Sequence, residues 1–137
     1  MRYNLFGPAK DIVLLVARVL LVALFVLFGW AKLTSFGGTV GYMASVGAPM
    51  PTIAAVIAVV MEFVVGLLIV AGFYTRPLAV LLALYTIGTG LIAHHFWSMT
   101  GPEQMENMIN FYKNVSIAGG LLALSIAGPG RLSVDRQ

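Results

Sequence analysis

Hydrophobic residues fall into long runs that are separated by short segments containing polar residues, glycine or proline. A helix needs roughly 20 mostly apolar residues to cross the hydrocarbon core of a bilayer. Runs of about this length predict membrane-spanning helices at about 12–30, 52–73, 78–97 and 106–127. The pattern therefore predicts an all-α membrane protein, in which four antiparallel transmembrane helices form a single domain over residues 1–137.

The segments between the runs contain the residues that end helices. Residues 34–51 are rich in glycine and include two prolines, so we expect an ordered surface loop, with a short interfacial helix around Tyr42. Residues 75–77 leave room for only a tight turn, which makes the second and third spans antiparallel neighbours. Gly128-Pro129-Gly130 ends the last helix, because glycine and proline together stop helical pairing.

The first and last runs need separate treatment. A secretory signal peptide is the alternative interpretation of the first run, but no small-residue cleavage pattern follows it and Arg18 interrupts it. We therefore expect this run to be a retained span. The last helix has polar first turns, and only residues 115–127 are uniformly apolar.

Composition supports a membrane protein. The chain is 60% hydrophobic and only 9% charged, against roughly 25% charged residues in typical soluble domains. A small water-soluble domain cannot bury so much apolar surface, so lipid must cover the excess. The net charge of +3 does not indicate a nucleic-acid partner, because the basic residues form no run or stripe. The absence of cysteine excludes disulfides and thiol redox chemistry within this chain.

Basic residues in short loops set the orientation of a membrane protein, because they favour the cytoplasmic side. Cytoplasmic termini would leave Lys32 and Lys113 on the outer side. The same orientation would place most of the other basic residues on the cytoplasmic side, namely Arg2, Lys10, Arg76, Arg131 and Arg136. We therefore expect both termini to be cytoplasmic.

Two charged residues fall within the predicted spans. Arg18 lies in the first span and Glu62 near the middle of the second. A charge at such depth costs about 2.5 to 3.5 kcal/mol on insertion scales, so each should face the bundle interior and find a partner. At 1.5 Å per residue the two would lie roughly 10 Å and 16 Å from the cytoplasmic boundary, a difference that an arginine can bridge. We expect an Arg18–Glu62 ion pair, whose role is either structural or functional.

Further polar residues should gather in the outer half of the bundle, above the level of Glu62. They are Lys32, His94, Asn110 and Asn114. Together with Arg18 and Glu62 they predict a polar pocket that opens outward, although polar residues between membrane helices also serve as packing contacts. No metal site is expected, because the adjacent His94 and His95 do not share a helix face.

The order and spacing of several motifs resemble the DoxX family over nearly the entire chain. The resemblance rests on an arginine-bearing first span, a glutamate in the second, His94 in the third, and a glycine-rich ending. The motifs are Phe28-Gly29-Trp30-Ala31-Lys32-Leu33, Gly72-Phe73-Tyr74-Thr75-Arg76-Pro77, Lys113-Asn114, Gly128-Pro129-Gly130 and Ser133-Val134-Asp135.

The resemblance implies a four-helix protein of the bacterial inner membrane. The family takes its name from a subunit associated with thiosulfate:quinone oxidoreductase and quinol oxidation, and distant members act as assembly chaperones or cargo receptors. Arg18, Glu62, His94 and Asn114 match the family's polar pattern, but the resemblance implies no catalytic residue at these positions.

Three functions are compatible with these observations. The first is an accessory subunit of a membrane redox process that binds a quinone in the polar pocket, where buried groups could deliver protons. No haem-ligand pair, flavin fingerprint or iron–sulfur cysteine set indicates an electron carrier in this chain, so we do not expect an enzyme on its own. The second is a non-catalytic assembly, chaperone or scaffold subunit for a partner protein. The third is a transporter or channel formed by a homo-oligomer.

Overall fold

The computed structural model describes residues 4–136, and in this part of the chain all regular structure is helical. Three helical segments are long and apolar enough to cross a membrane: Gly7–Thr34, Pro51–Ala71 and Thr75–Ser98. The elements are η1 (Gly7–Ala9), α1 (Lys10–Thr34), α2 (Phe36–Ser45), α3 (Pro51–Val59), η2 (Val60–Val64), α4 (Val65–Ala71), α5 (Thr75–Ala93), η3 (Phe96–Ser98) and α6 (Gly101–Ala127).

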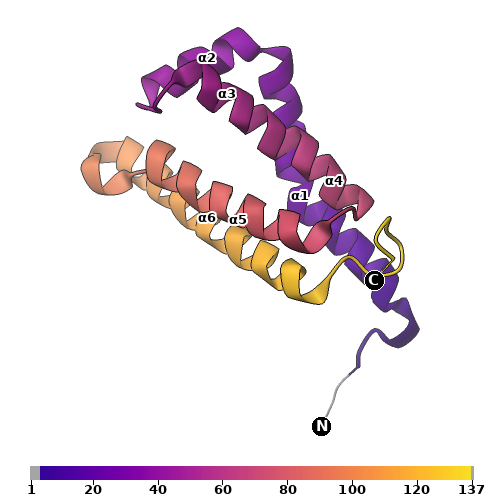
Figure 1. Ribbon diagram of the computed structural model, residues 1–137. Coiled ribbons are helices and arrows are strands. Elements are labelled where there is room, and N and C mark those ends of the chain that lie inside the picture. Colours follow the sequence, from indigo (N-terminus) through magenta and orange to yellow (C-terminus); the bar gives the residue numbers. More distant parts are fainter. Residues whose placement is uncertain (1–3, 137) are drawn as a thin grey trace.

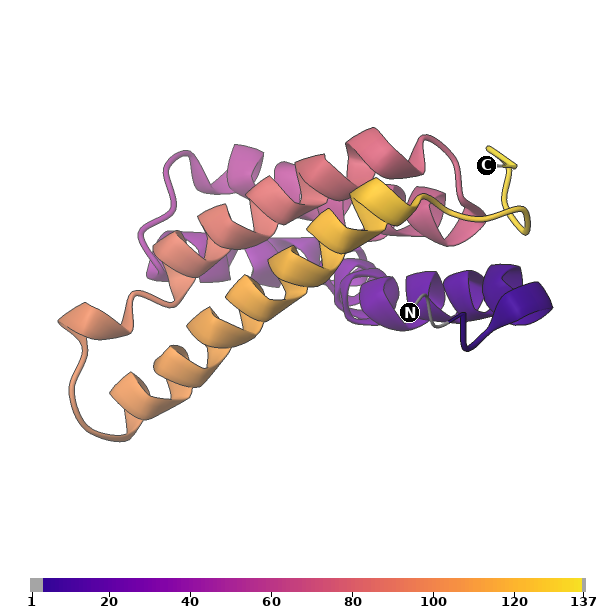
Figure 2. The same cartoon turned by 90° about the horizontal axis from the view of Figure 1, so that it is seen from below.

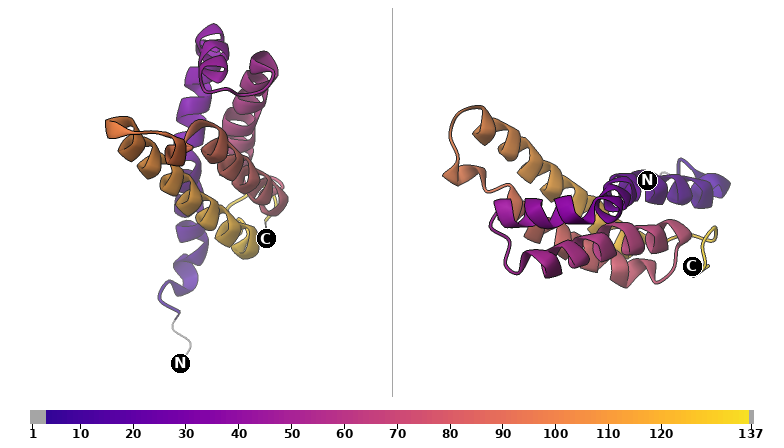
Figure 3. Two further views of the ribbon diagram at one scale, coloured as in Figure 1. Left: turned by 90° about the vertical axis from the view of Figure 1, so that its left-hand side faces the viewer. Right: turned by 90° about the horizontal axis from the view of Figure 1, so that it is seen from above.

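The helices form two pairs that cross each other. α5 and α6 are an antiparallel hairpin, while α1 packs against the continuous helix formed by α3, η2 and α4 (Figures 1 and 2). α2 folds back from the end of α1 and lies beside α3 (Figure 3). After α6, residues 128–136 cross to the end of α4 and the first half of α1 (Figure 1). We refer to residues 128–136 as the strap.

Small residues allow the Pro51–Ala71 helix to approach its neighbours. One face of this helix carries Ala55, Ala58, Glu62 and Gly66, and all four residues are buried. α1 contributes a matching face, in which Gly29 comes so close to the helix that an added Cβ would lie 2.5 Å from the backbone nitrogen of Phe63. The absence of side-chain atoms therefore sets the separation of these helices.

The interior of the bundle is small, and much apolar surface lies outside it. Large side chains such as Leu20, Leu84 and Ile126 are more than two-thirds exposed. An apolar exterior of this extent is expected where lipid is the solvent. The buried core contains Val22, Phe25, Met61, Val65, Ile69, Ala79, Leu82, Ala83, Ala118, Leu121 and Leu124.

The helix ends differ from the predicted ones where the chain turns. The short helix expected around Tyr42 is present as α2. α5 ends at Ala93, because His94 leaves the helical conformation with φ −125° and ψ 41°. α6 begins at Gly101 rather than near Glu106, with Pro102 in its first turn, where the missing N–H has no helical partner to lose.

Candidate functional site

Glu62 is the centre of a polar site between three helical segments. Its Oε1 accepts a hydrogen bond of 2.9 Å from the Nζ of Lys32 on α1, and the two groups form an ion pair. Its Oε2 accepts a hydrogen bond of 2.7 Å from the hydroxyl of Tyr85 on α5. Glu62 is only 8% exposed, so each carboxylate oxygen is held by a side chain from a different neighbouring helix. We call Lys32, Glu62 and Tyr85 the Glu62 site.

The backbone around Glu62 is unusual. Val60–Val64 forms a π-helical turn between α3 and α4, and Glu62 is its central residue. Such turns are uncommon inside α-helices and are frequent at functional sites. Gly29 packs against the backbone of Glu62 and Phe63, and Lys32 follows three residues later, on the same face of α1. The close approach at Gly29 thus places the lysine beside the carboxylate.

The predicted ion pair between Arg18 and Glu62 is wrong. Arg18 is fully buried, and its guanidinium donates to backbone carbonyls at the opposite end of the bundle, so it does not belong to the Glu62 site. The prediction failed because it paired charge with charge. Backbone carbonyls left free after a helix end can also satisfy a guanidinium, and Lys32 is the residue that supplies the charge to Glu62.

Asn114 is buried between α6 and α5. Its side-chain nitrogen donates to the carbonyl of Thr86 at 3.1 Å and to the hydroxyl of Thr89 at 3.4 Å. The carbonyl of Thr86 can only accept, so this bond fixes which end of the amide faces α5. Asn114 is 8% exposed, and its Oδ1 has no hydrogen-bond partner within residues 4–136. Asn114 on α6 is therefore bonded to Thr86, the residue of α5 that follows Tyr85, and keeps one acceptor unpaired.

A cavity of about 570 Å³ lies where α2 faces the ends of α5 and α6. We call it the loop-end cavity. Its wall includes two of the predicted pocket residues, His94 and Asn110, together with Tyr42, Glu103 and Glu106. The remaining lining residues are Ser45, Val46, Ala93, His95, Met99 and Asn107.

Hydrogen bonds fix the side chains in the wall of the loop-end cavity. The Nδ1 of His94 lies 2.9 Å from the Oδ1 of Asn107, and the amide nitrogen of Asn107 donates to the carbonyl of Glu103. This arrangement makes Nδ1 of His94 the donor and leaves its Nε2 as an acceptor in the neutral ring. Asn110 accepts a long hydrogen bond of 3.4 Å from Lys113.

Tyr42 connects the loop-end cavity with the Glu62 site electrostatically. It lines the cavity from α2. Burial raises the pKa of the Tyr42 hydroxyl, and the negative charge of Glu62 raises this pKa further. The field of the buried carboxylate therefore reaches the wall of the cavity.

The six predicted residues thus do not form one pocket and lie in four places. Lys32 and Glu62 are in contact, Asn114 is bonded to α5 at Thr86, and His94 with Asn110 line the loop-end cavity. Arg18 lies elsewhere. Sequence reasoning missed Tyr85, although a tyrosine within an apolar span usually needs a partner for its hydroxyl.

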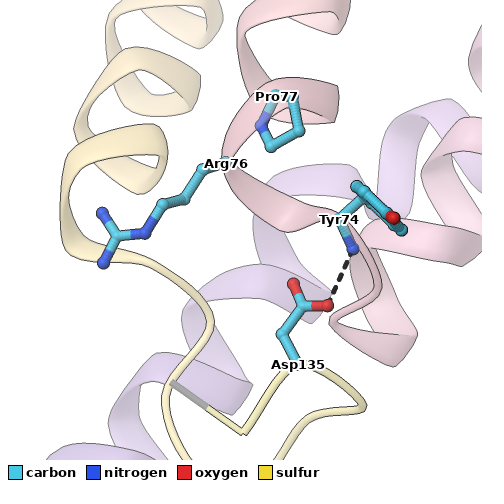
Figure 4. A pocket seen from close by; sticks show the side chains of 4 residues that line it. All are labelled: Tyr74, Arg76, Pro77 and Asp135. Carbon is cyan, nitrogen blue, oxygen red and sulfur yellow. Dashed lines mark hydrogen bonds between the residues drawn. The ribbon is translucent and has the colours of Figure 1, made fainter.

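A second cavity, of about 330 Å³, lies at the strap end and is lined by Tyr74, Arg76, Pro77 and Asp135 (Figure 4). The Asp135 carboxylate accepts hydrogen bonds of 3.0 Å from the backbone nitrogens of Tyr74 and Thr75, at the start of α5. Arg76 donates to the last carbonyls of α6, those of Ser125 and Ile126. Both side chains thereby satisfy helix ends.

Metal ligands do not gather in the described part of the chain, since residues 4–136 contain no group of three or more His, Asp or Glu side chains suited to a metal ion. The Glu62 site consists of hydrogen-bonding side chains and the Lys32–Glu62 ion pair. With its apolar exterior and buried polar centre, the fold defines an integral membrane protein.

Comparisons with known proteins give the family. The DoxX family model matches residues 13–95. The chain is 58% identical to inner membrane protein YphA of Escherichia coli (strain K12) over 137 residues, covering 100% of this chain and 98% of the relative. It is 39% identical to inner membrane protein YqjF of the same strain, covering 93% of this chain and 92% of the relative. The chain therefore belongs to the DoxX family, and it is a multi-pass protein of the bacterial inner membrane.

A more distant similarity connects the chain with a eukaryotic protein. It is 35% identical over 72 residues to the Surfeit locus protein 4 homolog of Schizosaccharomyces pombe, covering 51% of this chain and 24% of that protein. No solved structure matches the chain.

Proposed function

We propose that this DoxX protein crosses the inner membrane four times, with both termini in the cytoplasm, and binds a small ligand at the Glu62 site. We further propose that it serves a membrane redox process and that the ligand is a quinone. The observation that supports a ligand site is the Glu62 carboxylate, which lies on a π-helical turn and is held by Lys32 and Tyr85 from two other helices.

The topology proposal adds α6 to the three apolar helices as the fourth span. α6 has 27 residues, which at 1.5 Å per residue gives about 40 Å. Its second half is apolar, and its first half carries Asn110 and Asn114 towards the bundle interior and the loop-end cavity. Polar residues of a membrane helix are expected to face such a site rather than lipid.

The chemistry of the Glu62 site suits a ligand with carbonyl oxygens. The Lys32 side chain is 26% exposed, and an ammonium group has three N–H donors, of which Glu62 takes one. A quinone carbonyl can accept from the remaining donors. Reduction of a quinone to the quinol consumes two electrons and two protons. A redox partner protein would supply the electrons, and the Glu62 carboxyl group would transfer protons that arrive by way of the loop-end cavity.

Quinone binding tests this proposal directly. The protein is reconstituted in lipid nanodiscs, and the amount of ubiquinone-1 retained after equilibrium dialysis is measured. We expect saturable binding at one site, with affinity lowered about tenfold by Lys32→Met or Glu62→Gln, the loss of about 1.4 kcal/mol for one charged hydrogen bond. Lys10→Met, on the exposed first turn of α1, is the matched control and should bind like the original chain.

The outcome separates ligand binding from folding. Each variant is checked for its helical content and thermal midpoint before the quinone is added. If folded Glu62→Gln binds ubiquinone-1 as well as the original chain does, the Glu62 site is not the quinone site. If no form of the protein retains the quinone, the redox proposal is wrong and only the topology proposal remains.

A second candidate function is a scaffold or assembly subunit for a partner protein or a second copy of the chain. It is favoured by glycines that serve no internal packing: an added Cβ at Gly88 or Gly119 would meet no atom within 4 Å. Such positions leave backbone open to another helix. Gly88→Leu with Gly119→Leu should then abolish a complex seen by native mass spectrometry, while the binding of ubiquinone-1 stays unchanged.

A further inference from the structure

Arg18 is a fully buried charge whose hydrogen bonds all go to backbone carbonyls. Its guanidinium donates to the carbonyls of Pro129, of Leu132 at 2.7 Å and of Val70 at 3.1 Å. Its Nε has no partner within the described residues. Two of the three acceptors belong to the strap, so the strap supplies most of the polar environment that this charge has in the bundle.

The strap has attachments of its own that do not involve Arg18. The backbone nitrogen of Val134 donates to the carbonyl of Ala71 at 3.0 Å, and that of Asp135 donates to Gly72 at 2.9 Å. The Asp135 carboxylate accepts from the first backbone nitrogens of α5. These bonds hold the strap against the turn between α4 and α5.

The first half of the strap is bound to α1. The backbone nitrogen of Arg131 donates at 3.0 Å to the carboxylate of Asp11 in the first turn of α1. Gly130 packs against the same carboxylate and against Leu14. The strap therefore lies between α1 and the α4–α5 turn, and it joins the two helix pairs at this end of the bundle.

We propose that the strap locks α1 against the α4–α5 turn. Arg18 couples the docking of the strap to the packing of α1, so that the two form or are lost together. With the strap docked, the guanidinium has three acceptors. With the strap displaced, the same guanidinium keeps only the carbonyl of Val70, and a buried charge without partners is strongly unfavourable. States in which α1 stays packed while the strap is displaced are therefore unfavourable, because they leave the Arg18 charge buried with too few acceptors. As a result, α1 separates from the α4–α5 turn together with the strap.

A double-mutant cycle in the full chain tests the lock. Ser133→Trp displaces the strap, because the Cβ of Ser133 packs directly on Gly72. Val134→Trp is the matched control, since Val134 is 61% exposed and a large side chain there can remain in solvent. Each change is made with Arg18 present and with Arg18→Leu.

Thermal unfolding in nanodiscs, followed by circular dichroism, is the first readout. With Arg18 present, strap displacement should lower the midpoint by about 10 °C. In the Arg18→Leu background the same displacement should lower it by less than half as much, because no buried charge is left without partners. Val134→Trp should change neither midpoint noticeably. Equal shifts in the two backgrounds would overturn the proposal, because the strap would then act independently of Arg18.

Limited proteolysis provides a second readout that does not depend on full unfolding. Trypsin cuts the peptide bond after Arg131 when the strap leaves the bundle. In the docked state this site is held in place, because the backbone nitrogen of Arg131 donates to Asp11. Arg18→Leu alone should speed this cleavage severalfold, because the strap loses two of its hydrogen bonds. An unchanged cleavage rate in folded Arg18→Leu protein would show that the arginine does not hold the strap.

Discussion

The strap end of the bundle and the Glu62 site each bury a charged group, and they do so with different partners. At the strap end, Arg18 is surrounded by backbone carbonyls that belong to fixed helix ends and turns. In the Glu62 site, the carboxylate is held by the side chains of Lys32 and Tyr85. Backbone carbonyls neither titrate nor change rotamer, whereas side chains can move to another partner. The first arrangement is suited to locking the fold, and the second to exchanging hydrogen bonds with a ligand.

The difference extends to the space around each charge. Arg18 is closed off completely, while Lys32 is partly exposed, and the charge of Glu62 raises the pKa of Tyr42 in the wall of the loop-end cavity. We therefore expect changes at the strap end to act on stability and changes at the Glu62 site to act on ligand binding. Four substitutions, at Gly29, Arg18, Tyr85 and Glu62, test this division.

The largest effect is expected at Gly29, which positions both α1 and Lys32. Gly29→Leu places a side chain where even a Cβ would lie 2.5 Å from the Phe63 nitrogen. The atoms that it meets belong to the backbone of Glu62 and Phe63, which cannot turn aside as a flexible side chain can. We expect a loss of about 3 kcal/mol in the free energy of unfolding, together with loss of quinone binding. Unfolding by denaturant in a mixed micelle measures the first. Gly119→Ala, in open space on α6, is the control and should be neutral or slightly stabilising.

Arg18→Leu should lower the free energy of unfolding by about 2 kcal/mol, because it leaves buried carbonyls unpaired. Quinone affinity should stay unchanged, since Arg18 does not contact the Glu62 site. Stability and quinone affinity, measured together, decide whether the strap end and the Glu62 site have separate roles. A loss of ligand affinity without a loss of stability would reverse the roles assigned to them.

Tyr85→Phe should have a smaller effect on stability, about 1.5 kcal/mol for one hydrogen bond to a charged group. Its effect on quinone affinity should be several times larger than that of Tyr112→Phe, a control on the exposed face of α6. Isothermal titration in nanodiscs gives both affinities. If the two tyrosine variants behave alike, the Tyr85 hydroxyl has no part in the site.

The smallest effect concerns the reach of the Glu62 charge. Because this charge raises the pKa of the Tyr42 hydroxyl, Glu62→Gln should lower that pKa towards the ordinary value near 10. The phenol remains neutral at pH 7 in both forms, so the shift is seen only in an alkaline titration. Difference absorbance of tyrosinate, with Tyr42→Phe as the reference, isolates this residue. No shift would mean that the cavity and the Glu62 site are electrically separate.

The sequence predicted the architecture better than the site. The apolar runs located the three apolar helices. These features depend on local periodicity, which a single sequence contains. Lys32, Glu62 and Asn114 were also identified as interior candidates, because polar side chains in apolar helices usually face protein.

The partners of the charged residues could not be read in the same way. The acceptors of Arg18 include carbonyls of the strap, and every residue has a carbonyl, so no side-chain pattern marks them. The π-helical turn at Glu62 packs against α1 at Gly29, a tertiary contact that no local pattern marks. Pairing by charge and depth therefore selected Arg18, whereas the folded chain brings Lys32 to the carboxylate.

The polar first half of α6 has a consequence for the surrounding lipid. With α6 as the fourth span, its uniformly apolar part covers residues 115–127, about 20 Å of helix against a hydrocarbon thickness of about 30 Å. Such a hydrophobic mismatch is relieved by thinning of the adjacent leaflet. If α6 is the fourth span that we propose, we expect the bilayer beside it to be thinnest next to the loop-end cavity, where headgroups and water would descend towards the level of Asn114.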